Sequence, residues 1–170
     1  MTLAELNAMD RTAFVAVLGG IFEHSPWVAA RAFAARPFGS VDALHQAMVG
    51  AMHAASRDEQ LALIRAHPEL AGRAMVRREL TADSTSEQAG AGLTRCSPDE
   101  LARLTALNAR YHAKFGFPFI LAVKGWNRAG VIAELARRLE RDPAAEFAEA
   151  LAQIARIAGL RLAEKLPGSA

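Results

Sequence analysis

The sequence contains one cysteine, Cys96, and no apolar run of the length that crosses a membrane. A single cysteine excludes an intramolecular disulfide and argues against a metal site built from thiolates. A membrane-spanning helix needs roughly 18 or more consecutive apolar residues. Residues 1–10 include Glu5 and Asp10 and lack the basic start and apolar core of a secretory signal. We therefore expect a cytoplasmic protein with no membrane partner.

The sequence also lacks a concentration of charge of one sign. The formal net charge is +2, and the tight basic pairs are Arg77–Arg78 and Arg137–Arg138. A protein that binds nucleic acid collects Lys and Arg on one element or face, so we expect no nucleic-acid partner. With 52% hydrophobic and 22% charged residues, the chain has a globular composition. We predict a single domain over residues 1–170.

Helix signals, by contrast, are abundant. The residue types that dominate the chain, Ala, Leu, Arg and Glu, are strong helix formers. Thr2, Ser56 and Ser97 each precede a glutamate by three residues, and this capping-box spacing marks the start of a helix. Asp142 before Pro143 marks another start. Apolar residues recur at helical spacing between these signals, and no internal repeat is present. We predict an all-α fold, a compact bundle of about eight helices.

Two segments do not follow the helical pattern. Residues 80–93 are rich in Ser, Thr and Gly and show no sustained period. Residues 115–123 contain Gly116 and Pro118, which disfavour a helix, and then continue as an apolar run. A buried non-helical segment in a helical protein leaves backbone N–H and C=O groups that need other partners. A polar ligand is one way to supply them, so residues 115–123 are a candidate site.

His67 is the strongest single candidate for chemistry. Histidine is the side chain whose ordinary pKa lies near neutrality, so it gives or takes a proton at working pH. Pro68 disfavours helical geometry at the residue before it, so we expect His67 at a fixed break where a helix ends. The alternative is a histidine that merely stabilises the helix C-terminus through the helix dipole.

Each further candidate also has an ordinary alternative. Ser84 and Glu87 have capping-box spacing, and Gln88 has the alternative of a surface amide. Arg161 lies on the inner stripe of the last predicted helix, where a salt-bridged arginine is the alternative. His45 and His53 are eight residues apart on a predicted helix, but no third ligand lies nearby, so we expect no metal site.

Three segments occurring together in one order give a more specific signal. They are HPELAG from His67, Ser84-x-x-Glu87-Gln88-x-x-x-Gly92-Leu93, and Asn108-x-x-Tyr111-x-x-Lys114 followed by FGFPF. This set resembles the 2-oxo-4-hydroxy-4-carboxy-5-ureidoimidazoline (OHCU) decarboxylases of urate breakdown. The resemblance extends from about Leu3 to Leu166 and includes the helical pattern. Asp83 departs from it, because many relatives have a glutamate before the serine.

The resemblance implies a carboxy-lyase that converts OHCU to (S)-allantoin and carbon dioxide without a metal or organic cofactor, as a homodimer. It implies that His67 is the catalytic histidine and Glu87 its carboxylate partner. It also implies a set of substrate-binding residues: Pro68, Ser84, Gln88, Phe119, Ile120, Leu121, Ala122, Val123 and Arg161. Two other readings stay open at this point, a non-catalytic helical binding or regulatory domain, and a lyase or hydrolase acting on a related ureido or imidazoline compound.

Overall fold

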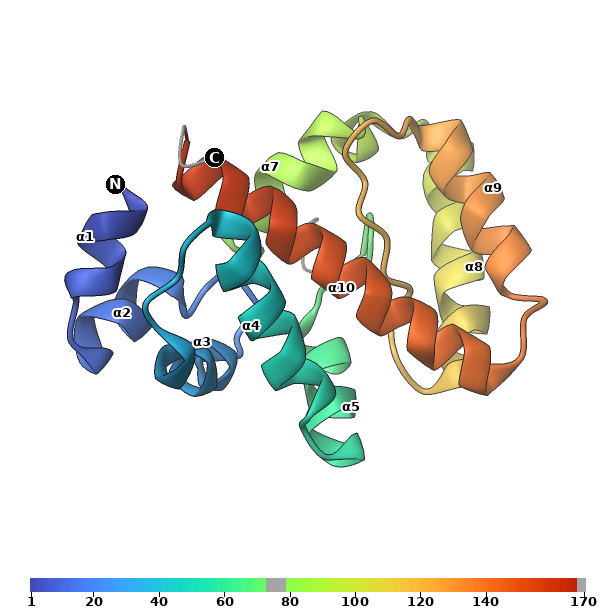
Figure 1. The fold of residues 1–170 in the computed structure, drawn as a ribbon. Coiled ribbons are helices and arrows are strands. Elements are labelled where there is room, and N and C mark those ends of the chain that lie inside the picture. Colours follow the sequence, from blue (N-terminus) through green and yellow to red (C-terminus); the bar gives the residue numbers. More distant parts are fainter. Residues whose placement is uncertain (73–78, 168–170) are drawn as a thin grey trace. The chain divides into compact units, whose positions relative to one another are not determined.

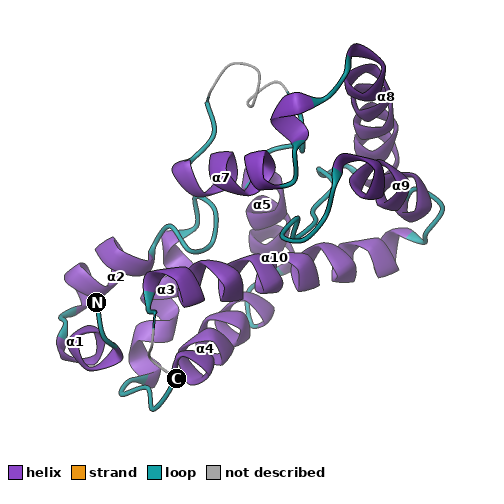
Figure 2. Cartoon of the chain, turned by 90° about the horizontal axis from the view of Figure 1, so that it is seen from above, coloured by secondary structure: helices purple, strands orange, loops and turns teal. Residues whose placement is uncertain are grey.

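A computed structural model describes residues 1–72 and 79–167. Within these residues the chain forms nine α-helices and two short 3-10 helices and no strand (Figures 1 and 2). The predicted all-α class is confirmed. None of the described helices is long and apolar enough to cross a membrane. The Arg77–Arg78 pair lies outside the described residues.

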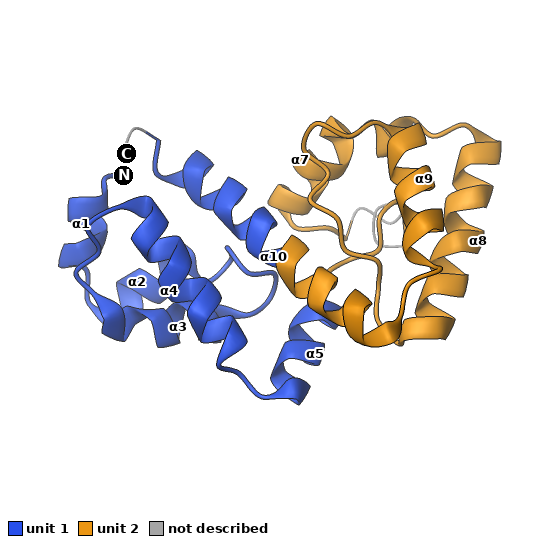
Figure 3. Cartoon of the chain, turned by 45° about the vertical axis from the view of Figure 1, so that its right-hand side comes forward, with its two compact units in different colours: residues 1–66, 154–170 blue, residues 67–153 orange. Residues whose placement is uncertain are grey.

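The chain divides into two compact units, coloured separately in Figure 3. Unit 1 comprises Met1–Ala66 and Ile154–Ala170, and unit 2 comprises His67–Gln153. The long C-terminal helix α10, Pro143–Lys165, contributes its first part to unit 2 and the remainder to unit 1. The expectation of a single domain over residues 1–170 stays a prediction.

Unit 1 consists of helices, four of which start at a side-chain cap. The helices are α1 (Leu3–Ala8), α2 (Arg11–Leu18), α3 (Pro26–Ala32), the 3-10 helix Phe33–Ala35, α4 (Val41–His53) and α5 (Arg57–Ala66). The predicted capping boxes at Thr2 and Ser56 are both formed, since each hydroxyl accepts a backbone N–H from the glutamate three residues on. The core of the unit is apolar and includes Leu6, Phe14, Leu18, Leu44, Met48 and Met52.

Unit 2 is built around an aromatic cluster. Its helices are α7 (Ala82–Gly90), the 3-10 helix Leu93–Arg95, α8 (Pro98–Phe115), α9 (Arg128–Arg138) and the first part of α10. The predicted capping box of Ser97 with Glu100 starts α8. The ring of Tyr111 lies 5.5 Å from that of Phe119, and the ring of Phe117 lies 5.9 Å from that of Phe147. These contacts fix the segment after α8 against helices of the same unit.

Residues 80–93 are a correction to the sequence analysis, because most of them form helix α7. The cap is Thr81, whose hydroxyl accepts the N–H of Ser84, so the predicted capping box of Ser84 with Glu87 is wrong. Ser84 and Gln88 are one helical turn apart and both buried. Burial of this face outweighs the weak helix propensity of Ser, Thr and Asp.

The second predicted exception, residues 115–123, is non-helical from Gly116 onward. Phe115 is the last residue of α8, and Gly116 follows with a φ of 75°, a left-handed conformation that glycine adopts at little cost. The residues from Phe117 to Leu121 are all buried. A non-helical segment therefore crosses the interior of unit 2, as predicted.

Candidate active site

His67 lies where the sequence predicts it, directly after the last residue of α5. Its side chain is 7% exposed, and Pro68 beside it is half-buried. A histidine that only stabilised a helix end could remain in water, as the exposed His53 does at the end of α4. The burial of His67 places its imidazole inside the protein.

Two buried amide side chains hold the chain just after His67. We call residues 67–71 the His67 loop. Gln88 accepts the N–H of Ala71 through Oε1 at 2.9 Å and donates through Nε2 to the carbonyl of Glu69 at 3.5 Å. Asn108 on α8 donates through Nδ2 to the carbonyl of Leu70 at 2.9 Å. Ala71 has a φ of 53°, which a non-glycine residue adopts only when its surroundings hold it there.

Helix α7 turns one face toward the interior. Ser84, Glu87 and Gln88 have the spacing that places side chains on the same side of a helix. Ser84 and Gln88 are 4% and 2% exposed and Glu87 is half-buried, whereas Thr85 and Ser86 are exposed. The alternative of a surface amide for Gln88 is therefore wrong. The structure brings Gln88 onto the His67 loop, so α7 links two of the three sequence motifs.

Another pair of polar side chains holds the segment Phe119–Val123. Arg138 on α9 donates through Nη1 to the carbonyl of Ile120 at 2.6 Å. Gln153 on α10 accepts the N–H of Ala122 through Oε1 at 3.0 Å. The guanidinium carbon of Arg138 also lies 4.5 Å from the centre of the Phe119 ring. Side chains thus supply the partners that a β-ladder would otherwise give this backbone.

A buried cluster of charged and polar groups fixes Arg138. Its Nε and Nη2 both lie 2.5 Å from Oε1 of Glu146, and both residues are fully buried. Tyr111 donates its hydroxyl to the same oxygen at 2.5 Å. Burial and the carboxylate of Glu146 together raise the pKa of Tyr111 far above its ordinary value. The phenol therefore stays a hydrogen-bond donor.

The sequence analysis missed four residues that hold these segments: Asn108, Arg138, Glu146 and Gln153. Asn108 and the Arg137–Arg138 pair were noted only as parts of patterns. A signal for Arg138 was present, since it continues the buried stripe of Val131 and Leu135 along α9. A charged residue at a core position of an amphipathic helix is rarely buried without a partner.

Arg161, the remaining predicted site residue, belongs to unit 1. Its Nη1 lies 2.7 Å from Oε2 of Glu23, and the carbonyls of Gly20 and Ile21 lie 3.5 and 3.4 Å away. Both charged side chains are buried. The salt bridge of the alternative interpretation is thus present, and the role of Arg161 in substrate binding stays a prediction.

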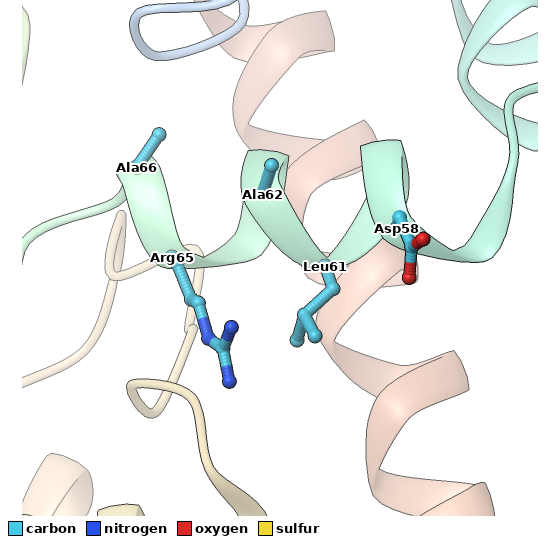
Figure 4. A pocket seen from close by; sticks show the side chains of 5 residues that line it. All are labelled: Asp58, Leu61, Ala62, Arg65 and Ala66. Carbon is cyan, nitrogen blue, oxygen red and sulfur yellow. The ribbon is translucent and has the colours of Figure 1, made fainter.

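The described contact of His45 and the lining of one surface hollow involve none of the predicted site residues. The ring Nε2 of His45 donates to the carbonyl of Ala155 at 2.8 Å, which gives this histidine a structural role. Across residues 1–72 and 79–167, no three His, Cys, Asp or Glu side chains could together hold a metal ion. Figure 4 shows an open hollow along α5, and none of the residues lining it was predicted: Asp58, Leu61, Ala62, Arg65 and Ala66.

Comparison with known proteins decides the family. The model of a family described as OHCU decarboxylase matches residues 7–163. A 2-oxo-4-hydroxy-4-carboxy-5-ureidoimidazoline decarboxylase of Haloferax volcanii is 45% identical over 165 residues, which cover 97% of this chain and 96% of that protein. The chain belongs to the OHCU decarboxylase family. The resemblance found in the sequence is therefore confirmed.

Other members and relatives of the OHCU decarboxylase family differ in overall length. A uric acid degradation bifunctional protein of Bacillus subtilis is 44% identical over 163 residues, which are 96% of this chain and 32% of that protein. A crystal structure of (S)-allantoin synthase superposes with a TM-score of 0.76 at 31% identity and covers 98% of this chain. This chain spans 54% of the length of that one. The same helical unit thus occurs alone and as part of longer chains.

Proposed function

We propose that this protein is a carboxy-lyase that converts OHCU to (S)-allantoin and carbon dioxide in urate breakdown. The observation that carries the proposal is the 45% identity with an OHCU decarboxylase along nearly the whole of both chains. The similarity to a bifunctional protein of uric acid degradation supports the same pathway. The structure adds a buried histidine at a helix end and two buried, polar-anchored segments in the same unit.

The substrate needs proton transfer and positioning more than it needs an external electron sink. The bond between the ring carbon and the carboxylate breaks, and its electron pair enters the ring, where the neighbouring imine nitrogen accepts it and is protonated. The 4-hydroxyl group loses its proton as carbon dioxide leaves, and it becomes a carbonyl when the carbon that bears the ureido group gains a proton. One proton enters from solvent overall. We propose that no metal or organic cofactor takes part.

His67 and Glu87 manage these protons in the proposed mechanism. His67 takes the proton of the 4-hydroxyl group, or relays it, as carbon dioxide leaves. Glu87 accepts a hydrogen bond from the other ring nitrogen and so sets the tautomer of the imidazole and raises its basicity. Protonation of the ring carbon on one face then gives the S configuration. The position of Glu87 on the inward face of α7 supports this pairing.

The substrate-binding residues follow the two anchored segments. We propose that Pro68, Ser84 and Gln88 line one side of the substrate, and that Phe119, Ile120, Leu121, Ala122 and Val123 line another. Both ends of the Gln88 amide form hydrogen bonds with the His67 loop, so Gln88 holds that loop as well as lining the site. Arg161 binds the substrate carboxylate in this proposal. That requires guanidinium N–H groups other than those that pair with Glu23.

The expected assembly and location are also proposals. We propose a homodimer in the cytoplasm, as the family resemblance implies. Light scattering on the purified chain tests the assembly, because a dimer has twice the 18.2 kDa mass of one chain. A particle with the mass of a single chain at micromolar concentration contradicts the dimer without affecting the proposed reaction.

The decisive experiment supplies freshly generated OHCU and follows optically active allantoin by circular dichroism. We expect the protein to accelerate its formation well beyond spontaneous decay, and no acceleration would reject the decarboxylase. His67→Ala is expected to lower the rate by roughly 100-fold or more, the usual contribution of a general acid or base. His53→Ala is the matched control, since His53 is also at the end of a helix but exposed. Full activity in folded His67→Ala would overturn the assignment of His67.

Glu87→Gln separates the catalytic carboxylate from a structural one. This variant keeps the size of the side chain and removes its charge. We expect a fall in rate with little change in stability, measured by thermal unfolding beside the same optical assay. An unchanged rate with lower stability would show that Glu87 acts only in holding α7.

A further inference from the structure

We propose that Arg138 and Gln153 are positioning residues that together orient the backbone of Phe119–Val123, so that the N–H and C=O of Leu121 face the bound substrate. We call these two side chains the backbone clamp. The inference rests on the proposed function. It adds two things: the residues that position this segment, and the part of the substrate that forms hydrogen bonds with it.

The backbone clamp forms hydrogen bonds with two residues of the segment that have one residue between them. Residues 118–123 are neither helix nor turn, and the two clamped groups are two residues apart, which is the repeat of an extended chain. In an extended chain the N–H and C=O of one residue point to the same side, and those of the next residue point to the opposite side. Arg138 holds the C=O of Ile120 and Gln153 holds the N–H of Ala122, two residues apart. Both groups therefore point toward α9 and α10.

Leu121 lies between the two clamped residues, so its own N–H and C=O point the other way. Its side chain and backbone are 4% exposed. Neither of its backbone groups makes a hydrogen bond with any part of the chain that the structure describes. Buried backbone groups are rarely left without a partner, so a ligand is the natural source of one. A donor and an acceptor side by side match the N–H and C=O edge of a ureide such as OHCU.

The clamp residues are themselves fixed by neighbours. Gln153 donates through Nε2 to Oε1 of Glu149 at 2.7 Å, which leaves its Oε1 directed at Ala122. That hydrogen bond is the main reason why the pKa of Glu149 lies below its ordinary value. Glu149 therefore remains an acceptor, and the amide of Gln153 cannot turn over without losing both contacts. Glu146 fixes Arg138 in the same manner.

Gln153→Met tests the clamp because it keeps the length of the side chain and removes the acceptor for Ala122. We expect kcat/KM for OHCU to fall about tenfold, the loss expected for one misplaced hydrogen-bonding edge, mainly through a higher KM. Assays are made well below the melting temperature of each variant. Gln60→Met is the matched control, since the amide of Gln60 also bonds the backbone, donating through Nε2 to the carbonyls of Met52 and His53 in unit 1. We expect less than a twofold change there.

A double substitution provides the rescue. Glu149→Gln with Gln153→Glu reverses the donor and the acceptor of the side-chain pair and keeps an oxygen for the N–H of Ala122. We expect KM to return to within about threefold of the original value, because one hydrogen bond replaces another. Gln153→Glu alone places two carboxylates together and is not expected to restore KM. Failure of the folded double variant to recover would overturn the acceptor role of residue 153.

Two outcomes separate this inference from the proposed function. Unchanged KM and kcat in Gln153→Met, even with a lower melting temperature, would show that the clamp is only structural. If the unmodified protein does not accelerate OHCU decarboxylation, the proposed function fails. The clamp itself is then judged by hydrogen exchange of the Ala122 amide, which Gln153→Met should accelerate at least about tenfold. Unchanged exchange would refute it.

Discussion

The His67 loop and the segment Phe119–Val123 perform the same task with different chemistry. Both are largely buried non-helical stretches of unit 2 that carry predicted site residues, and both are held by side chains from helices. Neutral amides, Gln88 and Asn108, hold the His67 loop. An arginine paired with a buried glutamate, together with one amide, holds the other segment.

The two kinds of anchor differ in the free energy that their burial costs and in the stability that is lost when one partner is removed. An amide is neutral, so burying it requires only that its hydrogen bonds are made. A buried ion pair must also recover the cost of taking two charges out of water, and it does so only while both partners are present. Mutation of the amides should therefore affect activity more than stability, and mutation of the ion pair should affect stability more than activity.

Arg138→Ala should have the largest effect on stability. It removes the closer of the two guanidinium groups beside the buried carboxylate of Glu146, since Nη1 of Arg141 lies 3.5 Å from the other oxygen. Loss of one partner of a buried pair costs about 3–5 kcal/mol of the free energy of unfolding. That is a large share of the roughly 5–15 kcal/mol available to a typical protein. Urea unfolding measures the loss. The double variant Arg138→Met with Glu146→Leu should be more stable than Arg138→Ala, and a loss below about 1 kcal/mol in the single variant would contradict a tightly paired cluster.

Gln88→Ala should have a smaller effect on stability and a larger one on activity per folded molecule. It removes the partners of the Ala71 N–H and the Glu69 carbonyl, which costs about 1–3 kcal/mol. Asn7→Ala is the matched control, since Asn7 bonds both the N–H and the carbonyl of Phe38 in unit 1. We expect similar losses of stability in urea and a fall in decarboxylation rate for Gln88→Ala alone. Equal activity in the two variants would show that the His67 loop needs no amide anchor.

The fold was largely predictable because its signals are local. The capping boxes at Thr2, Ser56 and Ser97 each lie within four residues of sequence, and all three start helices. The break at Gly116 was predictable for the same reason. Helix α7 was not, because its sequence is poor in helix formers and its stability comes from burying Ser84 and Gln88 against residues distant in the chain. Tertiary contacts of this kind leave no local pattern.

The residues of the candidate site also divide into those that local sequence motifs predict and those that depend on contacts between distant parts of the chain. His67 and Gln88 were found because they lie in short motifs that the sequence displays together. Arg138 and Gln153 were not, because each is separated from the backbone it holds by at least 18 residues. The buried stripe of α9 indicates that Arg138 needs a partner, but it does not indicate which one. The partners, Glu146 and the carbonyl of Ile120, are known only from the structure.

Alkaline titration gives the smallest effect at neutral pH and tests the charged anchor alone. Tyr111 is the only tyrosine, so phenolate absorbance reports on this residue without ambiguity. Its pKa is raised, first by burial and then by the hydrogen bond to Glu146, whereas a tyrosine in an unfolded chain ionises near pH ~10. The neutral phenol thus contributes to stability below about pH 10, and the contribution is lost as the pH rises further, because only the unfolded chain ionises readily.

We therefore expect the phenolate signal to appear together with the loss of helical circular dichroism, and not before it. Tyr111→Phe should remove the absorbance change and should reduce the loss of stability between pH ~9 and ~11, since phenylalanine has no proton to release. The side chains that hold the His67 loop, Gln88 and Asn108, do not ionise, so Gln88→Ala should leave the steepness of this alkaline transition unchanged. Ionisation of Tyr111 near pH ~10 in a chain that is still helical would mean that its hydroxyl is not held by Glu146, and the two anchors would then differ less than their geometry indicates.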